Sequence, residues 1–277
     1  MLNYNGTLIS NEILSISPNN RAFKFGDAVF EIVKIVNGKV IFWEDHYFRL
    51  MASMRMLRMK IPMDFTLEFL EQEILKTLPN EKKQLTQSAR LTVTRKDGGL
   101  YLPRTNKVDY LIQLQDISYS TKLKYSIDLY KDFFLYSGYL STVNSNNKLI
   151  NTLASIFAEE NELDDCILLN ERKGVVEVTD GNIFLVKDNI IKTPPISEGC
   201  LKGIIRGKVI EILLKHSEFT LEESIISPFE IQKADEIFIT NSIIGIQPVT
   251  NYRKKTFSTF TANKIAVSLK ILEVTAK

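Results

Sequence analysis

The chain has 277 residues, of which 44% are hydrophobic and 25% are charged, a composition that predicts a folded globular protein and excludes a disordered one. Lysine and arginine number 35 against 33 aspartates and glutamates, so the net charge of +2 does not favour nucleic-acid binding. Cys166 and Cys200 are expected to be free thiols in a cytoplasmic protein, and we expect no secretion signal and no membrane-spanning segment.

The first 118 residues predict an α+β domain with an antiparallel sheet. Asn37-Gly38 separates two apolar runs and predicts a β-hairpin turn, whereas Gly98-Gly99 predicts a loop between two later strands. Thr66 is the expected N-cap of the second helix. Hydrophobic periodicity predicts strands over 27–36, 39–43, 89–95 and 108–117, and helices over 44–59 and 65–78.

Residues 119–277 are expected to form a second domain, because the apolar pattern lapses in the polar stretch 116–124 and then restarts. Many short strands with few helices indicate a barrel-like or mixed sheet, so the whole chain is predicted to be a mixed α/β protein of two domains. The expected strands are 166–170, 174–179, 182–186, 190–193 and 236–240, and the expected helices are 148–160, 203–216 and 260–273.

Two charged residues stand where burial is expected. Lys148 begins an apolar helix pattern, and Glu177 lies inside a valine-rich strand pattern. A desolvated lysine loses its proton easily and suits Schiff-base chemistry, whereas a buried glutamate needs a cationic partner. Pyridoxal phosphate would satisfy both needs, through its aldehyde carbon and its ring nitrogen. From the residues alone this is one hypothesis among several.

Other site patterns fit less well. Only two histidines and no paired-cysteine motif occur, so a metal site is not expected. The stretch 199–209, "GCLKGIIRGKV", lacks the spacing of a P-loop, but Gly203 begins an amphipathic helix whose backbone N–H groups would suit a phosphate. His46 and Arg49 share one helix face, where a packed histidine and a solvated arginine are the simplest interpretation.

Five segments, taken together and in order, resemble the fold-type IV pyridoxal phosphate enzymes, also called class IV aminotransferases. They are "RAFKFGDAVFEIVKIVNGKVIFWEDHYFRL", "NKLINTLASIFA", "GVVEVTDGNIF", "LKGIIR" and "ADEIFITNSIIGIQPV". The resemblance implies a smaller N-terminal α/β domain and a larger barrel-like domain that binds pyridoxal 5'-phosphate. It also implies a homodimer that acts on a small-molecule amine, without a nucleic-acid or membrane partner.

Residue by residue, the resemblance implies that Lys148 forms the Schiff base and Glu177 pairs with the ring nitrogen. Two departures are visible: Ile205 stands where the aminotransferases have a hydroxyl residue, and Ala28 replaces the second glycine of G-D-G. The other cofactor-binding residues would be Arg49, Leu201, Gly203, Ile204, Ile205, Asn241 and Ser242. Contacts to the substrate are expected from Glu31, Arg95 and Tyr101, with Arg104 as a further candidate for holding a carboxylate.

The segments "TNSIIGIQPV" and "TRKDGGLY" are similar to those of aminodeoxychorismate lyase, which releases pyruvate and p-aminobenzoate for folate biosynthesis. They favour a lyase reaction. Leu100, however, stands where that lyase usually has arginine, and "GDAVFEIVKIVNGK" also resembles D-amino acid aminotransferase. The alternatives are therefore an aminotransferase that acts on branched-chain or D-amino acids with a 2-oxo acid acceptor, and a protein that only carries the cofactor.

Overall fold

The computed structural model describes residues 1–10, 14–82, 84–116, 120–215 and 217–275. The chain divides into an N-terminal unit, Met1–Ser118 with Asn144–Asn147, and a C-terminal unit, Tyr119–Val143 with Lys148–Lys277. The predicted boundary at residue 118 lies outside the described residues. Helices and sheets occur in both units, so the predicted mixed α/β class is confirmed.

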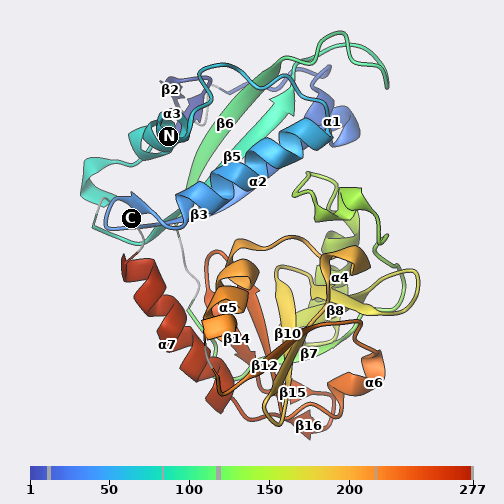
Figure 1. The fold of residues 1–277 in the computed structure, drawn as a ribbon. Helices are drawn as coiled ribbons and strands as arrows, with labels where there is room; N and C mark the ends of the chain where they lie inside the picture. The colour runs from blue at the N-terminus through green and yellow to red at the C-terminus, as the bar shows by residue number, and fades with distance from the viewer. Residues whose placement is uncertain (11–13, 83, 117–119, 216, 276–277) are drawn as a thin grey trace. The chain divides into compact units, whose positions relative to one another are not determined.

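The N-terminal unit contains one antiparallel sheet with the strand order β2-β1-β6-β5-β3-β4. Helix α2 packs against β3, and α3 packs against β1 and β4 (Figure 1). Its strands are β1 Leu2–Tyr4, β2 Thr7–Ile9, β3 Ala28–Val36, β4 Lys39–Val40, β5 Gln87–Arg95 and β6 Val108–Asp116. Its helices are α1 Arg21–Phe25, α2 Trp43–Met56 and α3 Leu67–Lys76, with a 3-10 turn at Asn80–Lys82.

The hairpin predicted at Asn37-Gly38 is confirmed. Both residues adopt positive φ, 50° and 73°, and they connect β3 to β4. The second strand of the hairpin is shorter than predicted, because β4 ends at Val40. Phe42 takes the left-handed conformation, φ 53°, and α2 begins at the next residue. The expectation of a strand over 39–43 was therefore wrong, since a left-handed residue interrupts an extended strand.

A short segment from later in the chain belongs to the N-terminal unit. The Phe30 N–H donates to the Asn144 carbonyl at 2.8 Å, and the Asn146 N–H donates to the Ala28 carbonyl at 3.1 Å. Residues 144–147 thus pair with the beginning of β3, directly before Lys148 in the sequence. No sequence pattern predicted this pairing.

The C-terminal unit contains two five-stranded sheets, β12-β11-β10-β13-β14 and β16-β15-β7-β8-β9. Buried side chains of both sheets, such as Ile167 and Ile237, share one core. Helix α4 packs against β8, and both α5 and α7 pack against β13 (Figure 1). The first sheet and its helices comprise β10 Asn182–Lys187, β11 Ile190–Thr193, β12 Thr220–Glu223, β13 Glu236–Asn241, β14 Gly245–Val249, α5 Ile204–Lys215 and α7 Phe260–Thr275. The remaining elements are β7 Ser126–Leu129, β8 Asp165–Leu169, β9 Val175–Val178, β15 Asn251–Tyr252, β16 Lys255–Thr256, α4 Leu149–Glu160 and α6 Pro228–Ile231, with 3-10 turns at Tyr139–Thr142 and Ile196–Glu198.

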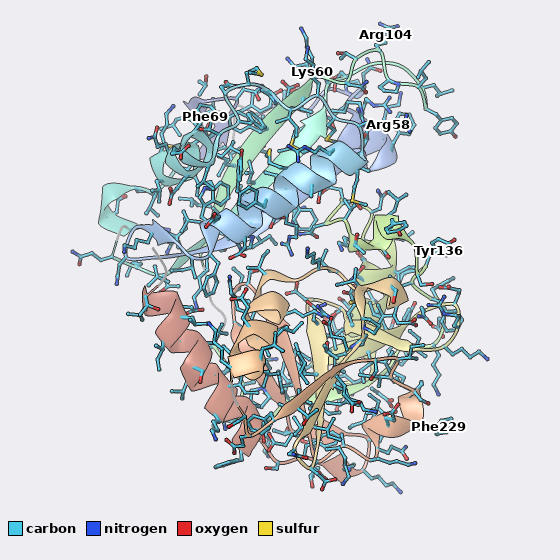
Figure 2. All side chains as sticks on the ribbon, viewed as in Figure 1. Arg58, Lys60, Phe69, Arg104, Tyr136 and Phe229 are labelled. Atoms are coloured by element: carbon cyan, nitrogen blue, oxygen red, sulfur yellow. The ribbon has the colours of Figure 1, made fainter. Side chains whose placement is uncertain are left out.

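The predicted helices at 148–160 and 203–216 each begin one residue later than expected, and His216 lies outside the described residues. Within the described residues, no helix combines the length and the apolar character needed to cross a membrane. Some aromatic side chains are nevertheless exposed, among them Tyr136 and Phe229 of the C-terminal unit (Figure 2). Scattered exposed apolar residues are normal on a protein surface.

Candidate active site

Lys148 occupies the N-cap position of α4 and is half-buried. Its carbonyl accepts hydrogen bonds from the N–H and the hydroxyl of Thr152, at 2.9 Å and 3.0 Å. These bonds fix the backbone of Lys148 at the first turn of the helix. The Lys148 ammonium also acts electrostatically on two carboxylates of the same unit, Glu177 and Asp180.

Glu177 lies in β9 and is 7% exposed. Its Oε2 accepts a hydrogen bond from the Leu201 N–H at 2.8 Å, and among the described residues no second donor reaches the carboxylate. Burial raises the pKa of Glu177 to about 7, against the opposing effects of the Lys148 charge and the Leu201 N–H. A buried carboxylate with so few donors gains stability when a cation pairs with it.

The residues directly before α5 form a tight turn that begins at Leu201. The Leu201 carbonyl accepts from the Gly203 N–H at 2.8 Å and from Asn182 Nδ2 at 2.9 Å. A Cβ at Gly203 would lie 2.0 Å from Asn182 Oδ1, so any larger residue would displace the Asn182 side chain that bonds the Leu201 carbonyl. The N–H groups of Ile204 and Ile205 belong to the first turn of the helix and have no intrahelical acceptor. Together with the helix dipole, they make this turn suitable for a phosphate.

The other expected phosphate contacts lie at the end of β13. Asn241 Oδ1 accepts from the N–H groups of Ile243 and Ile244 at 3.1 Å and 2.9 Å, and its Nδ2 donates to the Asp180 carbonyl at 3.0 Å. The Asn241 side chain therefore shapes the turn between β13 and β14. Ser242 follows it, is half-buried, and has a hydroxyl without a hydrogen-bond partner among the described residues. Of these two side chains, Ser242 is the better candidate for contacting a ligand.

Arg49 of the N-terminal unit is held by Glu31. Its Nε donates to Glu31 Oε1 at 2.9 Å and its Nη2 donates to Oε2 at 2.6 Å, while His46 Nδ1 lies 2.7 Å from Oε2. Burial alone would raise the pKa of Glu31, but Arg49 and His46 outweigh it and hold that pKa below its usual value. Burial lowers the pKa of His46, so its ring is neutral at neutral pH. The triad fixes the orientation of the Arg49 guanidinium.

The residues expected to contact a substrate lie in different settings. Glu31 is 1% exposed and is bound by Arg49 and His46. All three guanidinium nitrogens of Arg95 donate within the N-terminal unit, at 2.6–3.0 Å, to the Asp27 carboxylate, the Asn106 side chain and the Leu57 carbonyl. Tyr101, in contrast, is 82% exposed. The protein itself therefore engages Arg95, and its contact with a substrate stays a prediction.

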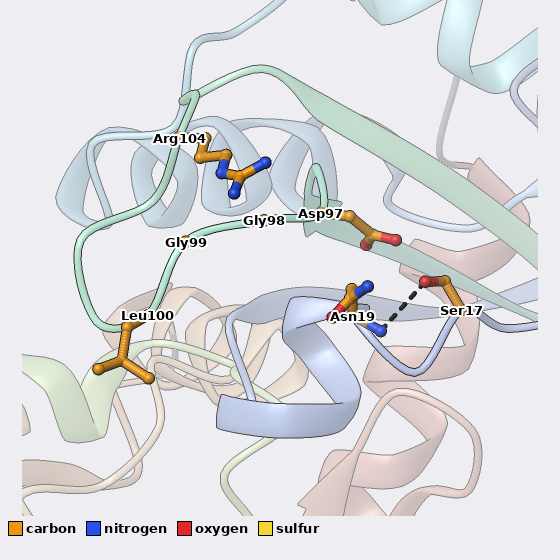
Figure 3. Close-up of a pocket in the computed structure, with 7 residues that line it drawn as sticks. All are labelled: Ser17, Asn19, Asp97, Gly98, Gly99, Leu100 and Arg104. Carbon is orange, nitrogen blue, oxygen red and sulfur yellow. Dashed lines mark hydrogen bonds between the residues drawn. The ribbon is translucent and has the colours of Figure 1, made fainter.

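A cavity of about 520 Å³ lies beside the Gly98-Gly99 loop of the N-terminal unit (Figure 3). Arg104 lies over Gly98, where an added Cβ would stand 2.9 Å from Arg104 Cδ. Across from it, Asp97 presents a carboxylate, and the hydroxyl of Ser17 accepts from the Asn19 N–H. Because the lining includes charges of both signs, the cavity indicates no particular ligand.

Arg90, in β5 of the N-terminal unit, is a candidate that the sequence reasoning missed. Its guanidinium carbon lies 3.6 Å from the centroid of the Phe30 ring, and its Nη2 donates to Asn146 Oδ1 at 3.1 Å. Burial lowers its pKa, and no carboxylate among the described residues pairs with it. The signal was available, since an arginine inside the apolar strand pattern 89–95 is as unusual as Glu177 in its own strand.

Comparisons with known proteins identify the family of the chain. The family described as Amino-transferase class IV matches residues 28–252, and the chain belongs to this family. It is 29% identical to a D-alanine aminotransferase of Bacillus licheniformis over 99% of the chain and 98% of the relative. It is 23% identical to an aminodeoxychorismate lyase of Vibrio harveyi, covering 83% and 85%. Its fold matches the branched-chain aminotransferase of Thermoproteus uzoniensis, with a TM-score of 0.89, 22% identity and coverage of 100% and 95%.

The family uses pyridoxal 5'-phosphate, so the chain is a pyridoxal phosphate enzyme, either an aminotransferase or a lyase. The residues present fit this cofactor. Glu177 is a buried carboxylate that has no bonded cation among the described residues, as a partner of the ring nitrogen should be. Gly203 begins a helix whose first N–H groups can receive a phosphate. Within the described residues, no group of acidic, histidine and cysteine side chains is arranged to hold a metal ion.

Proposed function

We propose that the chain is an aminotransferase that moves an amino group from an amino acid to a 2-oxo acid. The observation that carries its cofactor chemistry is the buried Glu177 of the C-terminal unit, whose pKa of about 7 reflects burial that the charge of Lys148 only partly offsets. Bound pyridoxal phosphate supplies an aldehyde that condenses with amines and a ring that accepts electrons. The chain must supply a base, a partner for the ring nitrogen and a receptor for the phosphate.

Each of these tasks has a candidate residue. Lys148 would hold the cofactor, and its neutral amine would move the proton between the substrate Cα and the cofactor's aldehyde carbon. Glu177 would keep a proton on the ring nitrogen, and the Leu201 N–H holds the Glu177 carboxylate in place at 2.8 Å. The Leu201 side chain would pack against the ring.

The phosphate is assigned to the N–H groups of Ile204 and Ile205 and to the hydroxyl of Ser242. Gly203 permits the close turn that presents these N–H groups. The hydroxyl that many aminotransferases have at the position of Ile205 is missing, so backbone donors replace it. Arg49, oriented by Glu31, is proposed as the cationic phosphate contact.

Within the N-terminal unit, Arg90 is proposed as a binding site for a carboxylate. A half-buried guanidinium that has no acidic partner among the described residues is electrostatically incomplete, and a ligand carboxylate would complete it. Phe30 and Asn146 already hold it in one orientation. Because Asn146 stands two residues before Lys148 in the sequence, Arg90 is anchored to the segment that leads into the cofactor lysine.

Two observations favour the aminotransferase over the lyase that the sequence first favoured. Arg95, part of the lyase-like segment "TRKDGGLY", is engaged by Asp27, Asn106 and Leu57, so it cannot serve a lyase substrate without breaking those bonds. The D-alanine aminotransferase of Bacillus licheniformis also matches more of the chain than the Vibrio harveyi lyase does, and at higher identity. The lyase remains the second candidate because the sequence "TNSIIGIQPV", in which Asn241 caps a turn, resembles the lyase segment.

The deciding experiment compares the two reactions on one preparation. An amino acid should convert the bound cofactor to its amino form, and a 2-oxo acid should convert it back. Branched-chain and D-amino acids with 2-oxoglutarate or pyruvate form the substrate panel. Pyruvate and p-aminobenzoate released from aminodeoxychorismate without any acceptor would overturn the aminotransferase in favour of the lyase, and no turnover in either assay would overturn both.

We also infer that the enzyme works as a homodimer in the cytoplasm. Membership of the family supports the dimer. Both cysteines, Cys166 and Cys200, are buried free thiols, which suits a reducing compartment. Light scattering of the purified protein tests the dimer, since a monomer at micromolar concentration would contradict it.

A further inference from the structure

Asn151 connects the helix that begins after Lys148 to the strand that carries Glu177. Its Nδ2 donates to the Thr179 carbonyl at 2.8 Å, and the side chain is half-buried. Asn151 follows Lys148 by three residues, and Thr179 follows Glu177 by two. This hydrogen bond therefore links Lys148 and Glu177, the two residues assigned to the ends of the cofactor, through only a few residues on each side.

Thr179 is held from its other side by Asp165. Asp165 lies in β8, is 3% exposed, and its Oδ1 accepts from both the N–H of Thr179, at 3.0 Å, and the Thr179 hydroxyl. The Cys166 N–H donates to the same oxygen at 2.7 Å. The Thr179 peptide is thus fixed between α4 on one side and β8 on the other.

The turn that follows Thr179 leaves little freedom for movement. The Val178 N–H donates to the Gly181 carbonyl at 2.8 Å, and a Cβ at Gly181 would lie 2.7 Å from the Thr240 carbonyl oxygen. Burial raises the pKa of Asp165 to about 6 in spite of its donors. Among the described residues Asp165 accepts hydrogen bonds from Tyr125, Cys166 and Thr179 but has no cationic partner, and the donors from Thr179 are the ones that connect it to the residue after β9.

We propose that Asn151 and Asp165 are positioning residues, which hold Thr179 and thereby set the separation between Lys148 and Glu177. The cofactor requires this, because its covalent bond and its ring-nitrogen contact are made at opposite ends of one rigid ring. Such a site must keep its side chains within about 0.5 Å of the productive geometry. The inference rests on the proposed roles of Lys148 and Glu177.

The first test replaces Asn151 by alanine and uses Asn161→Ala as the matched control. Asn161 lies at the other end of α4, and its Nδ2 also donates to a backbone carbonyl, that of Phe157, at 2.8 Å. Each substitution therefore deletes one hydrogen bond from a side-chain amide to a backbone carbonyl, but only that of Asn151 connects α4 to the residue after β9. Two properties are measured: the dissociation constant of pyridoxal phosphate, and the pH at which the absorption band of the bound cofactor changes.

Asn151→Ala should weaken cofactor binding about tenfold, the effect expected from one lost hydrogen bond, and should shift the spectroscopic titration by about half a pH unit. Asn161→Ala should leave both properties unchanged while lowering the melting temperature by a similar amount. If Asn151→Ala matches Asn161→Ala in both properties, the positioning role is overturned.

A second pair of variants keeps the test decisive if Asn151→Ala does not fold. Thr179→Val removes the hydroxyl that donates to Asp165, whereas Thr179→Ser keeps it. The valine variant should shift the titration, and the serine variant should restore it most of the way to wild type. Equal behaviour of the two would overturn the role of Asp165. A wild-type protein without a Lys148-dependent absorption band would instead overturn the proposed role of Lys148, and this inference with it.

Discussion

Glu31 of the N-terminal unit and Glu177 of the C-terminal unit are both glutamates buried in strands, at 1% and 7% exposure, but their surroundings differ. Glu31 receives two bonds from Arg49 and one from His46. Glu177 receives one bond, from the Leu201 N–H. Their pKa values accordingly move in opposite directions, below the usual value for Glu31 and up to about 7 for Glu177.

The charge of the Glu31 carboxylate is compensated within the protein, whereas we expect a bound ligand to compensate that of Glu177. The protein already provides the cation that Glu31 needs, and removing that cation would leave an uncompensated charge. The charge of Lys148 lowers the pKa of Glu177, but this effect does not offset the rise that burial causes. Burial alone therefore does not mark a functional residue, whereas burial without a bonded cationic partner does.

The largest expected effect is on stability in the N-terminal unit. Glu31→Gln removes the charge that balances Arg49 and should lower the free energy of unfolding by about 3–5 kcal/mol. Glu177→Gln should change it little, or raise it, because no protein cation loses its partner. Urea unfolding of both cofactor-free variants measures the difference. Equal losses in the two variants would remove the distinction between the two glutamates.

For catalytic activity we expect the opposite order, with the larger loss in Glu177→Gln. Glu177→Gln should lower kcat by about 10²–10³-fold, because a neutral amide no longer stabilises the charge on the ring nitrogen during reaction. Steady-state rates of the cofactor-saturated enzyme measure this. Glu236→Gln is the matched control, since Glu236 is also buried in the C-terminal unit but accepts from the N–H groups of Thr261 and Ala262 and from the Ser258 hydroxyl. A Glu177→Gln enzyme as active as this control would contradict the assigned role.

Glu31 and Glu177 should also make the free energy of unfolding depend on pH in opposite directions. The pKa of Glu177 is raised from 4.5 to about 7, so its contribution to the cofactor-free protein is complete below pH 4.5 and is lost as pH rises through 7. At about 1.4 kcal/mol per pKa unit, this loss is on the order of 3 kcal/mol at most. The pKa of Glu31 is lowered, so its contribution is present above pH 4.5 and is lost as pH falls through the lowered value.

Melting temperatures of cofactor-free wild type and Glu177→Gln, taken across this pH range, isolate the first effect. Asp165, with a pKa raised to about 6, titrates in the same pH range and is coupled to Glu177, so the comparison reports the titration of Glu177 together with this coupling. Wild type should lose stability relative to the variant as pH rises. Parallel curves would show that Glu177 does not carry the raised pKa.

The sequence indicated those features of the molecule that depend on near neighbours in the chain. Asn37-Gly38 predicted a turn because few residue pairs accept positive φ, and Thr66 predicted a helix start that is confirmed by its hydroxyl, which accepts from the Phe69 N–H at 3.1 Å. Lys148 and Glu177 were noticed because each puts a charge into an apolar pattern.

Features that depend on distant segments were not visible in the sequence. Glu31 was expected to contact a substrate, but its partners Arg49 and His46 lie 18 and 15 residues away, on a helix that packs against its strand. The pairing of 144–147 with β3, and with it the setting of Arg90, joins segments separated by more than fifty residues. Periodicity within one segment contains no information on such partners.

The smallest expected effect concerns His46, the neutral member of the triad. His46→Leu removes one donor to Glu31 but leaves both Arg49 bonds, so it should cost about 1–3 kcal/mol, less than Glu31→Gln. The pKa of Glu31 should rise, because one of the contacts that lower it is gone. His46→Gln, which can donate again, should recover part of both changes. Urea unfolding at acidic and neutral pH separates the two variants; if both match wild type, Arg49 alone compensates Glu31, and the contrast with Glu177 depends on one cation rather than on the number of donors.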